Sequence, residues 1–385
     1  MSMPFDEHRS WDLDPQVSGL KAGGLWRELR FLDSPQGPVV KSSEGRACIN
    51  FSSNDYLGLA SADDLKNALH EGVERYGAGS GASRLVCGTL QPHMALEEAL
   101  ASFKGTEAAL SFSSGFAVPL GVIPALVGPG DTIILDKLCH ASLVDAARLS
   151  GAILRIFPHN QLGKLERLLQ TAQGRVLVVA ESIYSMDGDA CPLAEMVELK
   201  DRHGAWLMLD EAHAVGVLGP QGRGLAAQRG LEQRVELQMG TLSKALGLSG
   251  GYLAASRSVI DLLINRARSF IYSTAPPPCI AHAAKTALEL IAGPEGEKRR
   301  AKLWQNLHLM KDKLCPEGPI ESAILPLIIG DENEAMAMSL RLREQGFLIP
   351  AIRYPTVARG AARLRITLSA AHESAEVQQL LAALA

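Results

Sequence analysis

The sequence lacks a long uninterrupted apolar segment and a strong excess of one charge. A membrane-spanning helix needs roughly 18 consecutive apolar residues, which no segment of this 385-residue chain provides. The formal net charge is −4, so the chain has no general attraction to nucleic acid or to an anionic membrane. The N-terminal residues also lack the basic start and apolar core of a signal peptide. We therefore expect a cytoplasmic protein with no nucleic-acid or membrane partner.

Cysteine is scarce, and its spacing excludes familiar metal and redox motifs. No two of the six cysteines form a CxxC pair: Cys48, Cys87, Cys139, Cys191, Cys279 and Cys315. Zinc sites and disulfide frameworks have characteristic spacings that are absent here. We interpret the six residues as reduced thiols and expect no bound metal.

Between about residues 47 and 285, short apolar runs alternate with helical patterns. Nearly continuous apolarity over four to six residues indicates strands that are buried on both faces of a largely parallel sheet. The runs are Ala108–Phe112, Thr132–Leu135, Val176–Ala180, Trp206–Leu209 and Tyr252–Ala255. Their alternation with helices predicts a doubly wound α/β domain.

The pattern changes near residue 275. The run Ala275-Pro276-Pro277-Pro278 fits neither a helix interior nor a central strand. A long helical pattern follows from about Ile280 to Leu314, and the remainder mixes strands with helices. We expect an N-terminal segment (1–46), a large domain (47–285) and a smaller α+β domain (286–385).

Residues able to carry chemistry follow the predicted strands, where open α/β sheets bind their ligands. They are Ser113, Ser114 and Gly115 after the first run, Ser185 after the third, Asp210 after the fourth, and Lys244 after residues 235–239. A lysine among small residues, partly withdrawn from water, has a lowered pKa and can act as a nucleophile or base. Such a lysine can form a Schiff base with an aldehyde cofactor such as pyridoxal 5′-phosphate (PLP).

PLP needs further partners, and the sequence offers candidates for each. A carboxylate such as Asp210 keeps the pyridine nitrogen protonated, and His213 could reach the phenolic oxygen. Small residues at a helix start, here Ser113 to Phe116, could offer backbone N–H groups to the phosphate. Taken singly, these residues could be a loop lysine, a strand cap and packed histidines. Only their order and spacing together favour a PLP site.

Several longer motifs share this order, and with them the chain resembles the α-oxoamine synthases, which are PLP enzymes of fold type I. The motifs are NFSSNDYLGL at 50–59, GSGASR at 79–84, HAS at 140–142, SMDGD at 185–189, DEAH at 210–213, GVLGPQGRG at 216–224, TLSK at 241–244 and YST at 272–274. The resemblance implies the aspartate aminotransferase fold, with a large, mostly parallel sheet domain and a smaller α+β C-terminal domain. Such enzymes build a shared active site across a homodimer.

Two C-terminal motifs, AIRYPTV at 351–357 and RLRITLSAAH at 363–372, are similar to one branch of the family. That branch condenses L-alanine with a pimeloyl thioester in biotin biosynthesis. The implied partners are therefore L-alanine and pimeloyl-CoA or pimeloyl-acyl carrier protein. Tyr354 departs from the proline that is common in relatives, which bears on substrate specificity.

Matched position by position, the resemblance implies roles for individual residues. Four are implied to be catalytic: Lys244 carries PLP, Asp210 pairs with the pyridine nitrogen, His213 contacts the phenolic oxygen and His140 stacks on the ring. The other cofactor contacts are Gly115 and Phe116 at the phosphate, Ser185, Thr241, and Thr274 from the partner subunit. The substrate contacts are Arg353 for the amino-acid carboxylate, Asn54, Arg30 and Thr356.

Other activities remain open on sequence grounds. Glycine C-acetyltransferase uses the same chemistry with glycine and acetyl-CoA. A PLP aminotransferase or decarboxylase would share the fold without needing a thioester, and fold alone does not decide function. A PLP-sensing regulator would need a fused DNA-binding domain, for which this chain has no room.

Overall fold

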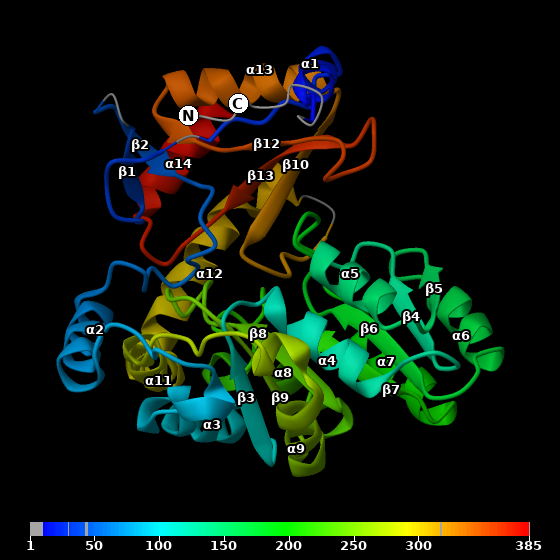
Figure 1. Ribbon diagram of the computed structural model, residues 1–385. Helices are drawn as coiled ribbons and strands as arrows, with labels where there is room; N and C mark the ends of the chain where they lie inside the picture. Colours follow the sequence, from blue (N-terminus) through cyan, green and yellow to red (C-terminus); the bar gives the residue numbers. More distant parts are fainter. Residues whose placement is uncertain (1–10, 30, 43–44, 316–317, 385) are drawn as a thin grey trace, which may run out of the picture.

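A seven-stranded sheet forms the centre of the computed structural model, which describes residues 11–29, 31–42, 45–315 and 318–384 (Figure 1). The strand order is β3-β9-β8-β7-β6-β4-β5, with parallel pairing from β5 across to β8 and antiparallel pairing of β9 with both β8 and β3. The strands are β3 (Ala108–Phe112), β4 (Thr132–Asp136), β5 (Ile153–Phe157), β6 (Val176–Glu181), β7 (Trp206–Asp210), β8 (Leu237–Thr241) and β9 (Gly251–Ala255). The predicted mostly parallel sheet is thus confirmed.

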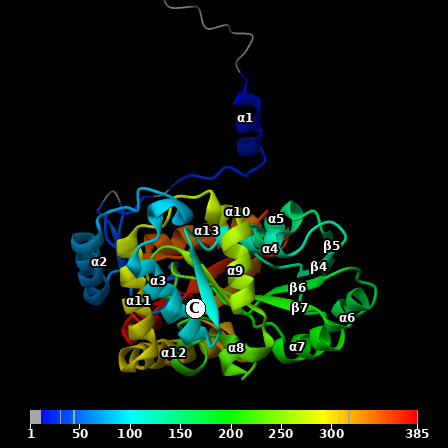
Figure 2. The ribbon, with the colours of Figure 1, turned by 60° about the horizontal axis from the view of Figure 1, so that its bottom comes forward.

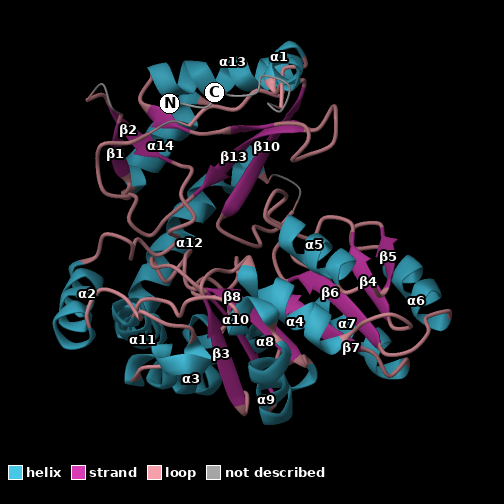
Figure 3. Cartoon of the chain, in the orientation of Figure 1, coloured by secondary structure: helices cyan, strands magenta, loops and turns pink. Residues whose placement is uncertain are grey.

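The central strands are apolar because helices cover the sheet on both faces (Figure 3). Every residue of β3, β4, β8 and β9 is buried, as the continuous apolar runs predicted. The edge strand β5 instead exposes Ile153 and Ile156. Its irregular burial gave no continuous run, which is why the sequence did not predict it. The helices in this part of the chain are α2 (Asp63–Tyr76), α3 (Gln91–Lys104), α4 (Ala117–Leu126), α5 (Ala141–Leu149), α6 (Leu162–Gln170), α7 (Leu193–Arg202), α8 (Leu225–Gln228), α9 (Arg257–Arg266) and α10 (Arg268–Ile271).

The predicted long helix after the proline run is two helices, α11 (Pro278–Ala292) and α12 (Pro294–Leu314). The break falls at Gly293, because Pro294 can start a helix but cannot continue one. The chain then forms an antiparallel sheet, in the order β10-β13-β12, flanked by two helices. These elements are β10 (Ile324–Gly330), α13 (Glu332–Glu344), β12 (Ala351–Ile352), β13 (Ala362–Thr367) and α14 (Ser374–Ala383).

The N-terminal segment joins this C-terminal part. Strand β2 (Ala47–Asn50) pairs with β1 (Val39–Lys41) on one side and in parallel with β11 (Phe347–Leu348) on the other. Helix α1 (Asp14–Ala22) buries none of its residues and projects from the body of the protein (Figure 2). Within the described part of the chain, no helix has the length and apolarity to cross a bilayer.

One buried ion pair fixes the turn after β7. Lys104, at the end of α3, donates a hydrogen bond to the carboxylate of Glu211, and the two side chains are 1% and 0% exposed. Lys104 also donates to the Arg223 carbonyl at 2.6 Å, and Glu211 accepts from the Ala226 N–H at 3.0 Å. All these bonds converge beside Asp210, so the pair holds in place the turn from which the predicted site begins.

We expect Lys104→Met to destabilise the protein by about 3–5 kcal/mol, because it leaves the Glu211 carboxylate buried without its partner. Denaturant unfolding of the PLP-loaded protein measures this. The matched control is Lys285→Met, which removes an exposed Lys–Glu pair (Lys285–Glu289) and should change stability little. Equal losses in the two variants would contradict the proposed anchoring role.

Candidate active site

Three neighbouring parallel strands end in polar residues at one edge of the central sheet. Glu181 ends β6, Asp210 ends β7 and Thr241 ends β8. Glu181 and Asp210 are register partners, so their backbones lie side by side. The loops that follow carry Ser185, His213 and Lys244, and the structure therefore brings together the residues that the strand ends predicted.

Lys244 contacts His213 at this edge. Its Nζ lies 2.8 Å from His213 Nε2. Burial lowers the pKa of Lys244 to about 8, although Asp210 and Glu181 act in the opposite direction. Burial also lowers the pKa of His213 well below its usual value, and the Lys244 charge lowers it further. A neutral His213 therefore accepts a hydrogen bond from the lysine.

The hydrogen bonds continue from His213 toward the C-terminal sheet. His213 Nδ1 lies 2.5 Å from the Tyr56 hydroxyl, which donates to Asn54 Oδ1 at 3.3 Å. The guanidinium of Arg365, on β13, donates to the same Asn54 oxygen at 3.1 Å. Burial raises the pKa of Tyr56 to about 12, so the phenol stays protonated. This chain, Lys244–His213–Tyr56–Asn54–Arg365, joins the large sheet to the small one.

Two buried carboxylates, those of Asp210 and Glu181, lie near Lys244. Burial raises the pKa of Asp210, an effect that Lys244 and a hydrogen bond from the Ala212 N–H at 2.9 Å oppose. Burial and the neighbouring Asp210 charge raise the pKa of Glu181. The Glu181 carboxylate also accepts the backbone N–H of His140 at 2.5 Å. The charge of Lys244 favours the ionised form of Asp210, and Glu181 orients the turn that carries His140.

Sequence reasoning did not select Glu181, Tyr56 or Arg365. Glu181 ends the apolar run at 176–180, so its position was a usable signal. Tyr56 and Arg365 lie inside the motifs NFSSNDYLGL and RLRITLSAAH, but the sequence does not show that their side chains meet. Their role became visible only from the hydrogen bonds that link them to Asn54.

His140 and Phe116 lie on the exposed side of the site. His140 is the N-cap of α5, and its Nδ1 lies 2.8 Å from Ser142 Oγ. Its ring meets that of Phe116 edge-on, with the centroids 6.2 Å apart. Gly115 and Phe116 lead into α4, and a Cβ added to Gly115 would lie 3.3 Å from Thr241 Oγ1. The glycine therefore keeps this helix start open for an anionic group.

The remaining predicted cofactor residues differ in how they connect to this group. Thr241 Oγ1 donates to the Gly250 carbonyl at 2.9 Å, and the carbonyl of Ser185 accepts from Arg365 at 2.6 Å. Thr274 is exposed and forms an isolated bridge with Ser83. Among the described residues, no hydrogen bond joins Thr274 to the Lys244 group.

The predicted substrate residues outside this group lie near the N-terminal segment. Arg353 donates to the carbonyls of Gly24 and Trp26, and Thr356 Oγ1 accepts from Arg27 at 3.4 Å. Both residues line a cavity of about 850 Å³ that is separate from the Lys244 contacts. Arg30 lies outside the described residues.

The assembled residues fit PLP. A half-buried lysine with a lowered pKa lies beside a buried carboxylate, and a glycine-containing helix start lies next to Thr241. These are the groups that an aldehyde, a pyridine nitrogen and a phosphate each require.

The sequence profile of the aminotransferase class I and II family matches residues 46–384. The chain belongs to this family. An 8-amino-7-oxononanoate synthase of Geobacter sulfurreducens is 49% identical to it over 96% of each chain. A serine palmitoyltransferase from S. paucimobilis, solved with a bound PLP–myriocin aldimine, has a TM-score of 0.90 at 30% identity and covers 97% and 96% of the two chains. An 8-amino-7-oxononanoate synthase from Francisella tularensis has a TM-score of 0.76 at 30% identity, with coverages of 88% and 96%.

These comparisons confirm the predicted family, fold type I and PLP as the cofactor. They also confirm the predicted branch, because the closely similar relatives are 8-amino-7-oxononanoate synthases, which are PLP-dependent acyltransferases. The individual site residues stay predictions, now with a geometry that supports Lys244, Asp210 and His213 most directly.

The lowered pKa of Lys244 predicts how its reaction with PLP depends on pH. Only the neutral amine attacks an aldehyde, so the reaction rate should rise with pH through about 8, rather than through the usual lysine value near 10.5. Stopped-flow absorbance on mixing apo-protein with PLP measures the rate. A rate still rising tenfold per pH unit between pH 9 and 10 would contradict the proposed environment.

Proposed function

We propose that this chain condenses L-alanine with a pimeloyl thioester at the site around Lys244, releasing carbon dioxide and a free thiol. The acyl carrier is coenzyme A or an acyl carrier protein. The observation that carries the proposal is the 2.8 Å contact between Lys244 and His213, beside two buried carboxylates and the buried Arg365. The 49% identity to a named 8-amino-7-oxononanoate synthase supports the choice of substrates.

The residues that would hold PLP surround Lys244. When bound, PLP supplies an electron-accepting ring that stabilises negative charge on the amino acid's α-carbon. The proposed contacts are Lys244 at the aldehyde carbon, Asp210 at the pyridine nitrogen, His213 at the phenolic oxygen, His140 on the ring face, the backbone N–H groups of Gly115 and Phe116 at the phosphate, and the hydroxyls of Ser185 and Thr241.

Lys244 is the group that moves the α-proton of alanine. Its pKa of about 8 leaves a useful fraction of neutral amine near pH 7, and general base catalysis is most effective when the pKa lies near the working pH. His213 stays neutral and directs the amine through its Nε2. His213 is buried, which keeps water from this ring.

We propose Arg365 as a second candidate, beside Arg353, for orienting the alanine carboxylate. It is buried, and its charge lowers the pKa of both Lys244 and His213. Its Nε and Nη1 already donate to Ser185, Asn54 and Thr367, which leaves Nη2 to meet the carboxylate. Arg353 remains a proposed substrate contact, together with Thr356, at the cavity beside the N-terminal segment.

A homodimer would complete the site. Large apolar side chains near it are exposed, including Val86 at 79% and Tyr272 at 73%, and both neighbour the Ser83–Thr274 bridge. Exposed apolar groups beside a site indicate a contact surface. We propose that a second copy covers them and that its Thr274 reaches the phosphate. Sedimentation of the PLP-loaded protein tests for the dimer.

The six cysteines of the chain are all unpaired in the structure. Unpaired thiols persist in reducing compartments. We propose on this basis that the enzyme works in the cytoplasm.

Thiol release distinguishes the proposed reaction from its alternatives. We expect the PLP-loaded protein to release thiol with pimeloyl-CoA and L-alanine, and not with acetyl-CoA and glycine. Release with the second pair only would indicate glycine C-acetyltransferase activity. Amino-acid turnover without thiol release would indicate an aminotransferase or decarboxylase.

Lys244→Ala should lower turnover by at least about 100-fold, because it removes the proposed base. The same variant should lose the visible absorbance of the lysine–PLP Schiff base. Both are measured on protein incubated with excess PLP, and circular dichroism confirms that the variant is folded. Retention of either property would contradict the assignment of Lys244 as the PLP-binding lysine and the base.

The two arginines make separable predictions. Arg365→Lys should raise the KM for alanine by roughly 10- to 100-fold, because a lysine cannot reproduce the planar set of charged hydrogen bonds that Arg365 makes. Arg353→Lys should affect the KM for alanine less if Arg365 holds the carboxylate. Steady-state kinetics of both variants measures the two KM values. A larger rise in the KM for alanine in Arg353→Lys would show that Arg353 binds the carboxylate.

A further inference from the structure

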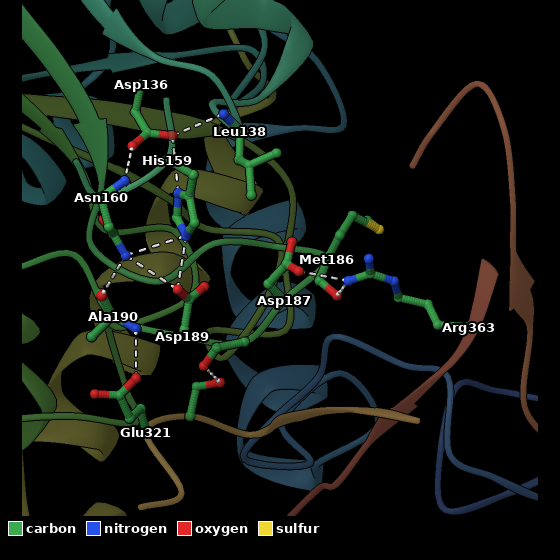
Figure 4. Close-up of polar contacts among 12 residues, drawn as sticks. Asp136, Leu138, His159, Asn160, Met186, Asp187, Asp189, Ala190, Glu321 and Arg363 are labelled. Carbon is green, nitrogen blue, oxygen red and sulfur yellow. Dashed lines mark hydrogen bonds and ion pairs between the residues drawn. The ribbon is translucent and has the colours of Figure 1, made fainter. Parts of the chain in front are cut away.

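Next to the site lies a histidine that the proposed function does not use. His159 follows β5, and each of its ring nitrogens faces a carboxylate (Figure 4). Nδ1 lies 3.1 Å from Asp136 Oδ1, and Nε2 lies 2.8 Å from Asp189 Oδ2. Ionised carboxylates only accept hydrogen bonds, so both nitrogens must carry protons. The ring is therefore a cation held between two anions.

One of these carboxylates shapes the turn that leads to His140. Asp136 ends β4 and is fully buried. It accepts the backbone N–H of Leu138 at 2.8 Å and that of Asn160 at 2.9 Å. His140, the proposed ring platform, comes directly after this turn. A change in the position of Asp136 would therefore shift His140.

The other carboxylate belongs to the loop that carries Ser185. This loop, residues 183–190, is closed by a bridge between Ile183 and Ala190. Asn160 reinforces the attachment of Asp189, donating to its Oδ2 at 3.2 Å and to the Ala190 carbonyl at 3.3 Å. His159 and Asn160 thus fasten the 183–190 loop to the large sheet.

The opposite side of the 183–190 loop is bound to the C-terminal part of the chain (Figure 4). Arg363 donates to Asp187 at 2.7 Å and to the Met186 carbonyl at 3.1 Å. Ser322 donates to the Gly188 carbonyl at 2.7 Å, and Glu321 accepts the Ala190 N–H at 3.0 Å. The loop therefore lies between two bodies, and its position depends on both attachments.

We propose that His159 is a positioning residue that, by bridging Asp136 and Asp189, sets the His140 turn and the 183–190 loop at a fixed separation within the proposed PLP site. This rests on the proposed function of the site. It assigns to His159 a role in cofactor placement that goes beyond packing. Removing the bridge should loosen His140 and Ser185 together, while the Lys244–His213 pair keeps its own supports.

The electrostatics around the ring agree with this geometry. Burial lowers the pKa of His159, but the hydrogen bonds and charges of Asp136 and Asp189 outweigh it and raise that pKa to about 10. The other titratable group that faces the ring is Tyr184, whose ring lies edge-on at 4.4 Å. Burial raises the pKa of the Tyr184 phenol, so it stays neutral. The bridge thus remains charged over the working pH range.

The raised pKa fixes the sign of a pH effect. The charged bridge contributes full stability below the unfolded histidine value of 6.5, and this contribution is lost as pH rises toward about 10. The difference in unfolding free energy between wild type and His159→Gln should therefore shrink from pH 6.5 to pH 9.5. Denaturant unfolding at several pH values measures it.

The decisive measurements use the folded, PLP-loaded His159→Gln protein well below its melting temperature. We expect the PLP dissociation rate to rise and kcat per bound PLP to fall, each by about 10- to 100-fold, because small misplacements at a reacting centre are costly. KM for alanine should rise less than kcat falls, because Asn54 and Thr367 still hold Arg365 when its contact with the Ser185 carbonyl loosens. His308→Gln, on the exposed face of α12, is the control.

If His159→Gln does not fold, Asp189→Asn carries the test. The Asp189 side chain is 36% exposed, and the amide keeps an acceptor for Nε2 while removing one charge. Asp189→Asn should raise the PLP dissociation rate and lower kcat per bound PLP, each by less than His159→Gln does. Wild-type PLP dissociation and kcat in the folded variants would overturn the proposal, even if melting temperatures fall. If wild type itself releases no thiol, the proposed function fails, and PLP dissociation still decides the role of His159.

Discussion

The active site depends on one buried chain of hydrogen bonds that runs from Lys244 through His213, Tyr56 and Asn54 to Arg365. Its direction follows from the chemistry of its members. Arg365 can only donate, so Asn54 presents its oxygen; that oxygen also accepts the Tyr56 hydroxyl. Tyr56 must then accept from His213 Nδ1, which leaves Nε2 free to accept from the lysine. The order of donors and acceptors along the chain thus fixes the tautomer of His213, with its proton on Nδ1.

This chain also explains why the two layers of the protein must stay together. Lys244 and His213 lie in loops after β8 and β7 of the large sheet, whereas Arg365 lies on β13 of the small one. Tyr56 and Asn54 come from the stretch after β2, which is itself paired with β11. A relative movement of the layers would therefore break the chain at Asn54, where the two sets of donors meet. The 183–190 loop makes a second connection of the same kind.

The sequence revealed those parts of the site that follow from strand ends. Asp210 and Ser185 were predicted correctly as polar residues after buried runs, and Lys244 as a lysine among small residues after another. Glu181 was not predicted, because the apolar run before it ends at Ala180. Tyr56 and Arg365 were not predicted for a different reason. They are separated by more than 300 residues, and only tertiary packing brings both to Asn54. The relation of Arg353 to the N-terminal segment was equally invisible, because backbone carbonyls leave no pattern in a sequence.

We propose that the balance of buried charges favours an amino acid as the substrate. Burial and the Asp210 charge raise the pKa of Glu181 and so favour its neutral form, which leaves Asp210 as the carboxylate that faces the charge of Lys244. Unpaired buried charge is costly, and the α-carboxylate of the substrate supplies the missing negative charge. In the proposed reaction that carboxylate leaves as carbon dioxide. If Arg365 binds that carboxylate as proposed, the product no longer pairs with it, and the interaction that captured the substrate does not slow product release.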